Sequence, residues 1–403
     1  MKETVFKAVQ ISKHVHWVGA IDWTVRDFHG YLTNRGSTYN AYLIIADKIT
    51  LVDTVKAPFR YELVSRISSL IDPEDISIII SNHSEMDHSG CLPEIIDLVK
   101  PDKVYASAMG VKNLSSHFHN IPEIIPVKDG DTISLGNLNI AFMETRMLHW
   151  PDSMFSYLKG ERVLFSQDAF GMHIASHERF TDEIEDSVIE YEAAKYFANI
   201  LLLYAALIPK ILEKAKKYNV DPAIIAPDHG PVWRSSEDIN KILGFYTRWS
   251  EQKPSQKAVV VYDTMWGSTE LMARAIGEGI EKEGIHVRLL SLKGAHRSDV
   301  ATEILDAGAL IIGSPTINNN MFPTVADLMS YLKGLKPKNL VGAVFGSYGW
   351  SGEAVKHIEA IFDEMRIKRA DESVAVEYVP DEEALLRCYN LGKLIGLKLK
   401  NNV

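Results

Sequence analysis

Cysteine is nearly absent from this chain of 403 residues, which contains only Cys91 and Cys388. Two thiols so far apart in the sequence predict no disulfide framework. They also fall short of the roughly four thiolates that an iron–sulfur or rubredoxin-type centre needs. Any redox chemistry must therefore use other cofactors, and its electrons must come from outside such a module.

Basic residues are outnumbered by acidic ones, 43 to 53. The formal net charge is −10, and no basic cluster offsets it, which argues against nucleic acid as a partner. Residues 1–4 begin no signal peptide, so we expect a cytoplasmic protein. The most apolar stretch, residues 198–208, is shorter than the about 20 residues that cross a bilayer, and it lies between Lys195 and Lys210. It predicts a buried helix and no membrane partner.

The length of the chain predicts two or three domains. Residues 251–257 form the best candidate linker, because they are polar, contain Pro254 and have no apolar face. We therefore predict one domain over residues 1–252 and a second over residues 253–403.

Potential metal ligands crowd residues 83–88, where His83, Glu85, Asp87 and His88 follow the apolar run 76–80. A helix-like pattern over 92–99 comes next, so these side chains are expected at the carboxyl end of a buried strand. A helix cap at Asp87 or Ser89 would explain one of the polar residues but not all four. The cluster therefore predicts a metal site.

Three further candidates, His149, Asp168 and His229, each follow an extended apolar run later in the chain. A single histidine at a strand end is more often structural, but three after such a cluster favour a common site. Seven ligands are enough for two adjacent metals that share one carboxylate.

The two predicted domains differ in pattern. The first has strands at 16–21, 39–45 and 49–53, a helix at 61–71, a second strand-rich half over 103–168 and a helical region from about 182 to 218. Periodicity alone shows only a mixed α/β domain there. The second alternates strands at 258–262, 287–290, 310–313, 341–346 and 374–377 with helices, which predicts a doubly wound, five-stranded parallel sheet.

The first strand of the second domain leads into a segment rich in hydroxyl groups, residues 264–269. Hydroxyls, a glycine and free amides at a helix N-terminus form an anion cradle, although a plain capped turn has the same composition. The glycines of a dinucleotide fingerprint and the lysine of an NTPase loop are missing. Segments with polar and aromatic residues, 314–320 and 347–352, follow two later strands. Such segments suit a flat ring with hydrogen-bonding groups along its edges. The candidate binding residues are Thr264, Met265, Trp266, Gly267, Ser268, Thr269, Ser314, Pro315, Thr316, Asn318, Asn319, Ser347, Tyr348, Gly349, Trp350, Ser351 and Gly352.

The order His-x-Glu-x-Asp-His, then His, Asp and His, resembles that of the flavodiiron proteins, flavin-containing oxygen or nitric oxide reductases of the metallo-β-lactamase superfamily. The resemblance implies an αββα sandwich in the first domain. It implies one iron at His83, Glu85 and His149, another at Asp87, His88 and His229, and Asp168 as the bridge. The zinc hydrolases of the superfamily usually carry histidine where Glu85 stands, and a carboxylate there favours iron although zinc also accepts it.

The segment 264–269 likewise resembles the phosphate loop of flavodoxins, which bind FMN. Trp266 replaces a small hydroxyl residue common there, and we expect Trp266 and Trp350 near the flavin. Either of them, like Tyr348, would equally suit a core or surface position. His173 and Tyr196 are candidates for the surroundings of the metals or for buried structural positions.

A flavin beside two metals needs a redox-active acceptor, which closed-shell zinc cannot be. We therefore expect an oxidoreductase that reduces dioxygen to water, with FMN and two non-haem irons as cofactors. A short two-domain chain is similar to the methanogen flavodiiron proteins that oxidise reduced coenzyme F-420, so we expect this coenzyme to be the electron donor. The alternatives are a nitric oxide reductase with separate rubredoxin as donor, and a zinc hydrolase fused to a flavodoxin-like domain. The resemblance also implies a head-to-tail homodimer, possibly paired into a tetramer.

Overall fold

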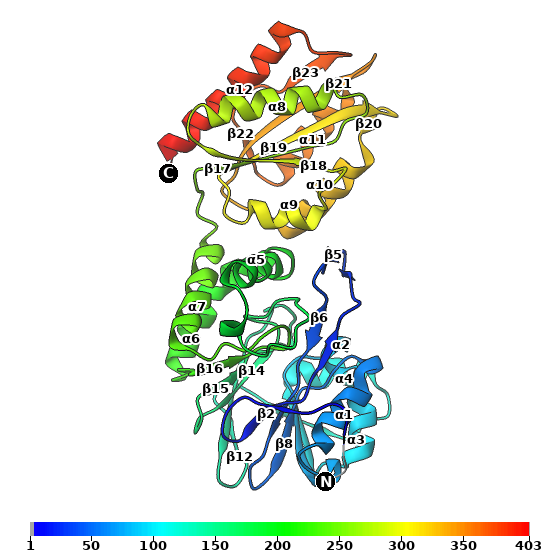
Figure 1. Cartoon of the computed structure of the whole chain (residues 1–403), viewed down its shortest axis with the longest axis vertical. Coiled ribbons are helices and arrows are strands. Elements are labelled where there is room, and N and C mark those ends of the chain that lie inside the picture. The colour runs from blue at the N-terminus through cyan, green and yellow to red at the C-terminus, as the bar shows by residue number, and fades with distance from the viewer. Residues whose placement is uncertain (1–3, 403) are drawn as a thin grey trace. The chain divides into compact units, whose positions relative to one another are not determined.

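The computed structural model describes residues 4–402, which form two compact units (Figure 1). The first comprises Met1–Tyr196 with Ala206–Thr247, and the second comprises Phe197–Ala205 with Arg248–Val403. Residues 252–256 follow the helix Ser236–Glu251, whose last residues belong to the second unit, and lead into the first strand of the second unit. The segment Phe197–Ala205, which the predicted boundary keeps in the first domain, packs in the second unit. There the Asn199 side chain donates to the Ser298 carbonyl at 3.2 Å and accepts from the Tyr331 hydroxyl at 2.7 Å.

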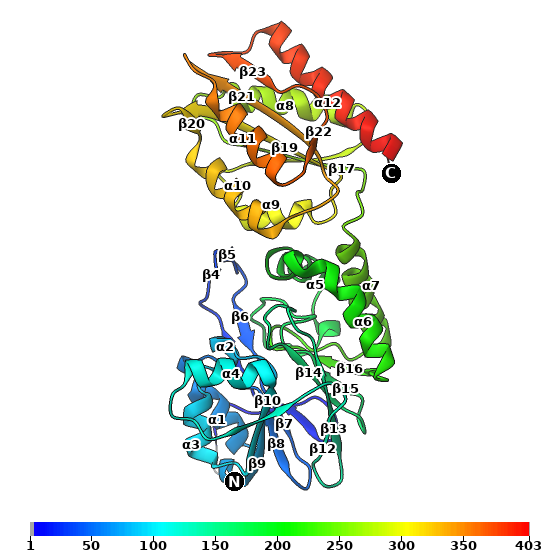
Figure 2. The same cartoon turned by 180° about the vertical axis from the view of Figure 1, so that it is seen from behind.

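Two sheets form the first unit (Figure 2). The seven-stranded sheet has the order β1-β2-β7-β8-β9-β10-β11, and the five-stranded sheet has the order β12-β13-β14-β15-β16. The strands of the first sheet are β1 (Val9–Gln10), β2 (Val15–Trp17), β7 (Tyr42–Ile44), β8 (Ile49–Val52), β9 (Ile76–Ser81), β10 (Lys103–Ser107) and β11 (Ile124–Val127). Those of the second are β12 (Thr132–Ser134), β13 (Asn139–Glu144), β14 (Met154–Leu158), β15 (Val163–Phe165) and β16 (Ile224–Ala226).

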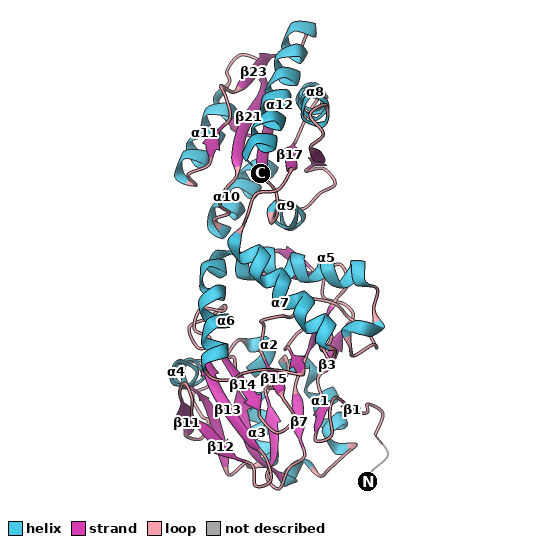
Figure 3. Cartoon of the chain, turned by 90° about the vertical axis from the view of Figure 1, so that its left-hand side faces the viewer, coloured by secondary structure: helices cyan, strands magenta, loops and turns pink. Residues whose placement is uncertain are grey.

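Alternation along β9 shows how the layers are held together. Ile78 and Ile80 point into a core shared with Phe142 and Phe165 of the second sheet, so the two sheets pack face to face. Ile79, on the opposite side, joins a second core formed with helices α1 (Arg60–Ser68), α3 (Leu92–Val99) and α4 (Ala108–His117). Helices α6 (Ile208–Lys217) and α7 (Ser236–Glu251) lie on the outside of the second sheet, as Figure 3 shows. This is the αββα sandwich that the resemblance implied.

The predicted strands at 16–21 and 39–45 are each divided in two. The structure has β2 and β3 (Ala20–Asp22) in place of the first, and β6 (Ser37–Tyr39) and β7 in place of the second. Asn40 marks the break, because its amide donates to the Asp228 carbonyl at 2.7 Å and its side chain donates to the carbonyls of Pro227 and Gly230. The chain leaves the ladder here to hold the loop that carries His229. A short hairpin, β4 (Asp27–Phe28) and β5 (Tyr31–Leu32), lies between β3 and β6.

The predicted helical region changes type along its length. It consists of α5 (Asp186–Tyr196), a π-helix (Phe197–Leu201), a 3-10 segment (Leu202–Leu207) and α6. The expected buried helix at 198–208 is therefore a π and 3-10 segment, and its buried side chains include Leu201 and Leu202. Among the described residues, the stretch Asp186–Lys217 is long and apolar enough to span a membrane by length and composition alone. Half of its apolar window is buried inside the protein, as in a core helix, so the evidence for a membrane span is weak.

The second unit is a doubly wound parallel sheet with the order β18-β17-β19-β21-β22. Its strands are β17 (Lys257–Tyr262), β18 (His286–Ser291), β19 (Ala309–Ile317), β21 (Val341–Tyr348) and β22 (Lys368–Arg369). A further strand, β23 (Val374–Glu377), pairs in parallel with the later part of β21, so β22 and β23 share one edge and the predicted five-stranded sheet is confirmed. A short strand, β20 (Asn320–Met321), returns antiparallel to β19.

Helices cover both faces of this sheet. Helices α8 (Ser268–Glu281) and α12 (Glu382–Asn402) share a core with β17 and β19. Figure 3 shows α10 (Pro323–Leu335) and α11 (Glu353–Glu364) on the other side, and α9 (Arg297–Ile304) follows β18 in the chain. The contact between α8 and α12 depends on two glycines. A Cβ atom at Gly279 would lie 2.0 Å from the Tyr389 carbonyl oxygen, and one at Gly392 would lie 2.0 Å from that of Ile276.

Replacing Gly279 with alanine should therefore force α8 and α12 apart and lower the free energy of unfolding by about 1–3 kcal/mol. The matched control is Gly277→Ala on the same helix, where the nearest atom to a new Cβ is 3.8 Å away. That change should be neutral or stabilise the unit by about 0.4–1 kcal/mol, because alanine is the better helix former. Denaturant unfolding measures both, and equal stability of the two variants would contradict the close contact.

Candidate metal centre and cofactor pocket

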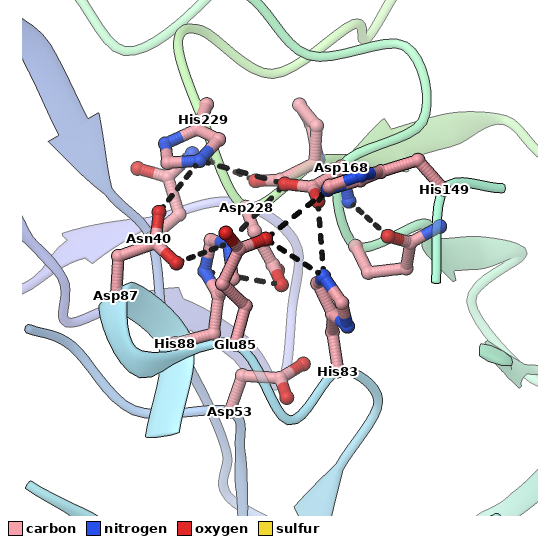
Figure 4. A network of polar contacts seen from close by, with 12 residues as sticks. Asn40, Asp53, His83, Glu85, Asp87, His88, His149, Asp168, Asp228 and His229 are labelled. Carbon is pink, nitrogen blue, oxygen red and sulfur yellow. Dashed lines mark hydrogen bonds and ion pairs between the residues drawn. The ribbon is translucent and has the colours of Figure 1, made fainter. Parts of the chain in front are cut away.

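The ligand segment begins where β9 ends. The short helix α2 (Met86–Ser89) bends the chain directly after Glu85, and this bend turns Asp87 and His88 toward the same point as His83 (Figure 4). All four predicted ligands of this segment are buried. The remaining three stand in loops of the other sheet. His149 lies between β13 and β14, Asp168 follows β15, and His229 follows β16.

The seven side chains form two groups. Within each group, the potential ligand atoms all lie within 4.8 Å of one another. The first group contains His83, Glu85, His149 and Asp168, and the second contains Asp87, His88 and His229. The structure therefore brings together all seven residues that the sequence singled out. For the six residues other than Asp168, the two groups are the same as those that the resemblance implied.

Asp168 joins the two groups, because each of its oxygens faces a different pair of imidazoles (Figure 4). Oδ2 lies 3.3 Å from Nε2 of His83 and 3.0 Å from Nε2 of His149. Oδ1 lies 3.2 Å from Nε2 of His88 and 3.4 Å from Nε2 of His229. A carboxylate in this position can give one oxygen to each of two metals.

Each group has one further carboxylate. Glu85 Oε2 lies 3.2 Å from His83 Nε2 and 3.1 Å from His149 Nε2. Asp87 Oδ2 lies 3.2 Å from His229 Nε2, and its Oδ1 lies 3.4 Å from His88 Nε2. Each group thus offers nitrogen and oxygen atoms that converge on one point, which is the donor set of a non-haem iron or a zinc ion.

Several buried polar atoms of the two ligand groups make no hydrogen bond, which is evidence that metals bind there. Both oxygens of Asp87, both ring nitrogens of His88 and Oδ1 of Asp168 are buried without a hydrogen-bond partner. Without a metal or a protonated imidazole beside it, a carboxylate buried in this way would cost several kcal/mol of folding free energy, as a buried unpaired ion does. Divalent cations bound by these atoms would remove that cost, so the residues fit a pair of metals.

The electrostatics agree with this conclusion. Burial disfavours charged imidazoles, yet the carboxylates of Asp87 and Asp168 raise the pKa of His88 to about 9. Asp168 and Glu85 likewise raise the pKa of His149 to about 9. Without metal, the excess negative charge would be balanced by protons on these rings at neutral pH, and bound metals would replace those protons.

Four residues near the ligands were not singled out from the sequence. Asp152 lies 3.1 Å from His83 Nδ1, and His29 Nε2 lies 2.8 Å from Glu85 Oε1. Asp228 Oδ2 lies 3.5 Å from His88 Nδ1, and Asp53 accepts from the amide and the side chain of Asn82. Asp152 and Asp228 stand close in sequence to His149 and His229, and this proximity could have identified them from the sequence. His29, at the turn of the β4–β5 hairpin, gave none.

His173 and Tyr196 are both fully buried beside the second group. The His173 ring centroid lies 4.5 Å from that of His229, and the Tyr196 ring centroid lies 6.0 Å from it. His173 Nδ1 is 2.8 Å from the Ser37 hydroxyl, and burial lowers the pKa of His173 well below its usual value, so the ring is neutral. Both residues therefore lie behind a ligand and outside the ligand set.

The second unit contains a pocket of about 650 Å³ at the carboxyl ends of β17, β19 and β21. A pocket of this size suits a ligand as large as a mononucleotide. Predicted residues that line it are Met265, Trp266, Ser268, Pro315, Thr316, Asn318, Asn319, Ser347, Tyr348, Gly349, Trp350 and Ser351. Tyr378, which follows β23, and Ile317 also line it and were not predicted.

The rest of the predicted set supports the walls of the pocket. Gly267 has φ +93° at the start of α8, and its amide donates to the Thr264 hydroxyl at 3.0 Å. Thr269 Oγ1 lies 2.8 Å from Ser347 Oγ, which ties the start of α8 to the end of β21. Ser314 accepts from the Phe322 amide, while Gly352 precedes α11 and lies outside the lining.

Two tryptophans stand at the rim of this pocket. Trp266 is 95% exposed and Trp350 is 88% exposed, although both line it. Flat apolar rings held in water beside a pocket suit contact with a planar ligand or with an approaching partner. The helix N-terminus with its positive-φ glycine offers free amides for a phosphate group.

Comparison with known families assigns both halves of the chain. Residues 38–230 match the ODP family beta lactamase model, and residues 260–392 match the flavodoxin model. The chain is 44% identical over 395 residues to a nitric oxide reductase of Moorella thermoacetica, covering 97% of this chain and 98% of that protein. It is 43% identical over 396 residues to the rubredoxin-oxygen oxidoreductase of Megalodesulfovibrio gigas, covering 98% of each.

Solved structures agree over the whole chain. The rubredoxin oxygen:oxidoreductase from Desulfovibrio gigas has a TM-score of 0.96 at 43% identity and covers 98% of this chain and 99% of its own. The flavodiiron protein from Giardia intestinalis also has a TM-score of 0.96, at 33% identity, covering 100% of this chain and 98% of its own. With a metallo-β-lactamase-like domain followed by a flavodoxin-like domain, and with relatives this similar along their full length, the chain belongs to the flavodiiron protein family.

Proposed function

We propose that this protein is an oxidoreductase that reduces dioxygen to water at its metal centre, with FMN in the second unit passing on the electrons. The observation that carries the proposal is Asp168, whose two oxygens face two separate ligand groups. FMN and a pair of non-haem irons are the cofactors that these residues fit. Bound there, the irons would supply the electrons and the coordination positions that reduction of a small oxidant requires.

The protein's own residues hold this centre and shield it. Seven ligands from two sheets fix the distance between the two metal positions, and the surrounding side chains keep bulk water away because nearly all are buried. Zinc would suit the same nitrogen and oxygen atoms, but it cannot take part in electron transfer from a flavin. The flavodoxin-like unit therefore favours iron.

Nitric oxide is the second candidate substrate, because a relative 44% identical to this chain carries the name nitric oxide reductase. For the donor, the name of the Megalodesulfovibrio gigas relative favours a separate rubredoxin. Reduced coenzyme F-420 is the other candidate, since a hydride donor suits FMN, which can release the two electrons singly. The two cysteines, both buried, suit a reducing compartment, and we propose the cytoplasm.

Anaerobic reduction of the flavin by each candidate donor, followed by rapid mixing with each gas, tests the proposal. We expect reduced rubredoxin to bleach the flavin absorbance within the time of turnover, and dioxygen to restore it with water as the product. Faster reduction by reduced F-420 would reverse the choice of donor. If nitric oxide reoxidises the enzyme and dioxygen does not, the choice of substrate is wrong, and a protein isolated with two zinc ions and no iron would refute the oxidoreductase.

The flavin site is tested by Gly267→Val. Its φ of +93° is strained for a β-branched residue, and the new side chain would stand where the backbone must approach the phosphate. We expect FMN to be lost while the metal content is unchanged. The matched control is Gly284→Val, because Gly284 also has a positive φ of +76° and open space around it. It should carry the same strain and keep its FMN. A Gly267→Val chain that retains one FMN would place the phosphate elsewhere.

We further propose that the protein works as a head-to-tail homodimer, in which the flavin of one chain serves the metals of the other. The short connection of residues 252–256 does not require a chain to bring its flavin to its own metals. A two-fold arrangement supplies the close approach that electron transfer needs, and two such dimers could pair into a tetramer.

Subunit mixing tests this arrangement. An Asp168→Ala chain should bind FMN without the metal pair, and a Gly267→Val chain should bind metals without FMN, so each alone should be inactive. After subunit exchange, mixed dimers should recover activity, because one of the two flavin–metal pairs at their interface joins an intact flavin to an intact metal centre. If exchange is demonstrated by mass spectrometry and no activity returns, electron transfer occurs within one chain.

A further inference from the structure

Asp152 lies behind His83, one histidine of the first ligand group, and stands in the loop that carries His149, the other histidine of that group. Its Oδ2 accepts from the amide of Ser84 at 2.7 Å and lies 3.1 Å from Nδ1 of His83. Its Oδ1 accepts from the Asn113 side chain at 3.2 Å. The residue is 1% exposed, and its contacts with Ser84 and His83 are buried.

The backbone of Asp152 is fixed as well. Its carbonyl accepts from the hydroxyl of Ser107 at 2.7 Å, and Ser107 also caps α4 by accepting from the amide of Gly110. Asp152 stands three residues after His149, in the loop that carries that ligand into the site. One buried residue thus ties the His149 loop, the His83 segment and the start of α4 together.

The contact selects one orientation of His83. When Nδ1 donates its proton to Asp152, Nε2 is left without a proton, as a metal ligand must be. That Nε2 atom lies 3.2 Å from Glu85 Oε2 and 3.3 Å from Asp168 Oδ2, in the centre of the first ligand group. The imidazole is therefore directed at the metal position by an interaction on its far side.

The second ligand group lacks an equivalent. His88 Nδ1 is 3.5 Å from Asp228 Oδ2 and makes no hydrogen bond, and neither oxygen of the buried Asp228 has a hydrogen-bond partner. His229 Nδ1 lies 2.6 Å from the Thr38 carbonyl oxygen, a neutral acceptor. Of these three histidines, His83 is the one whose Nδ1 makes a hydrogen bond with a carboxylate, that of Asp152. His83 belongs to the ligand group that contains Glu85 and His149.

We propose that Asp152 is a positioning residue that orients His83, so that the metal position at His83, Glu85 and His149 depends on it more than the position at Asp87, His88 and His229. The inference rests on the proposed function only in requiring metals at this centre. It concerns metal binding without donor or gas, so it is tested separately from the reaction.

The experiment titrates the metal-free full-length protein with Zn²⁺ in competition with a chromophoric chelator. Zn²⁺ serves as the probe because it is redox-silent and accepts the same ligand atoms. In Asp152→Ala, one of the two binding constants should fall by about 10–100-fold, the usual effect of losing a partner behind a ligand histidine. The other should change by less than about threefold. Asp152→Asn keeps the shape and an oxygen acceptor without the charge, so it should show a smaller loss at the same position.

A spectroscopic measurement separates positioning from simple loss of structure. In the zinc-loaded protein with ¹⁵N-labelled histidine, the hydrogen-bonded Nδ1 proton of His83 should give a downfield signal that is protected from exchange. It should disappear in Asp152→Ala and move upfield in Asp152→Asn. Asn113→Ala is the matched control, because it removes a contact of Oδ1 and leaves both contacts of Oδ2. It should retain the signal and both binding constants.

Unchanged binding of two Zn²⁺ ions in both Asp152 variants would overturn the proposal. Equal weakening at both positions in Asp152→Asn would also overturn it, because the residue would then support the domain and not His83. Neither result would contradict the proposal that the protein reduces dioxygen. Conversely, if the unsubstituted protein binds both metals but reacts with neither gas, the proposed function is refuted and the role of Asp152 still stands.

Discussion

A carboxylate buried between two pairs of imidazoles is the interaction on which the first unit depends. Asp168 is 1% exposed, and its two oxygens face four ring nitrogens at 3.0–3.4 Å. Three carboxylates and four imidazoles gathered below the surface would repel or remain unpaired without cations. The site is therefore stable only as a metal centre or as a protonated cluster, and the raised pKa values of His88 and His149, about 9 in each case, describe the second state.

The sandwich makes this arrangement possible because the ligands come from both sheets. His83 to His88 follow β9 of the first sheet, while His149, Asp168 and His229 follow strands of the second. The shared core of Ile78, Ile80, Phe142 and Phe165 holds those strand ends at a fixed spacing. Since rigid elements place ligands more accurately than mobile loops, packing between the sheets determines the geometry of the site.

The sequence predicted that the seven candidate ligands would converge, because each is a polar residue that follows an apolar strand. It predicted the parallel sheet and the pocket residues for the same reason. Two partners behind the ligands were missed, since Asp152 reaches His83 and His29 reaches Glu85 through contacts between distant segments. The breaks in the N-terminal strands were missed because they depend on Asn40 binding the loop near His229. The local sequence pattern around Asn40 does not predict this contact, because the contact joins segments far apart in the chain.

The two cofactor sites make opposite demands on the chain. The metal centre needs buried charge, whereas the flavin pocket uses backbone amides at a helix N-terminus and exposed aromatic rings. Neither cysteine can substitute for these cofactors, because both are buried; burial raises the pKa of Cys91 and raises that of Cys388 to about 11. Without a reactive thiolate, the chain has no electron store of its own outside the two sites. In the proposed reaction, electrons from a donor would enter at the pocket beside Trp266 and Trp350, whose rings are exposed, and would pass to the buried metal centre.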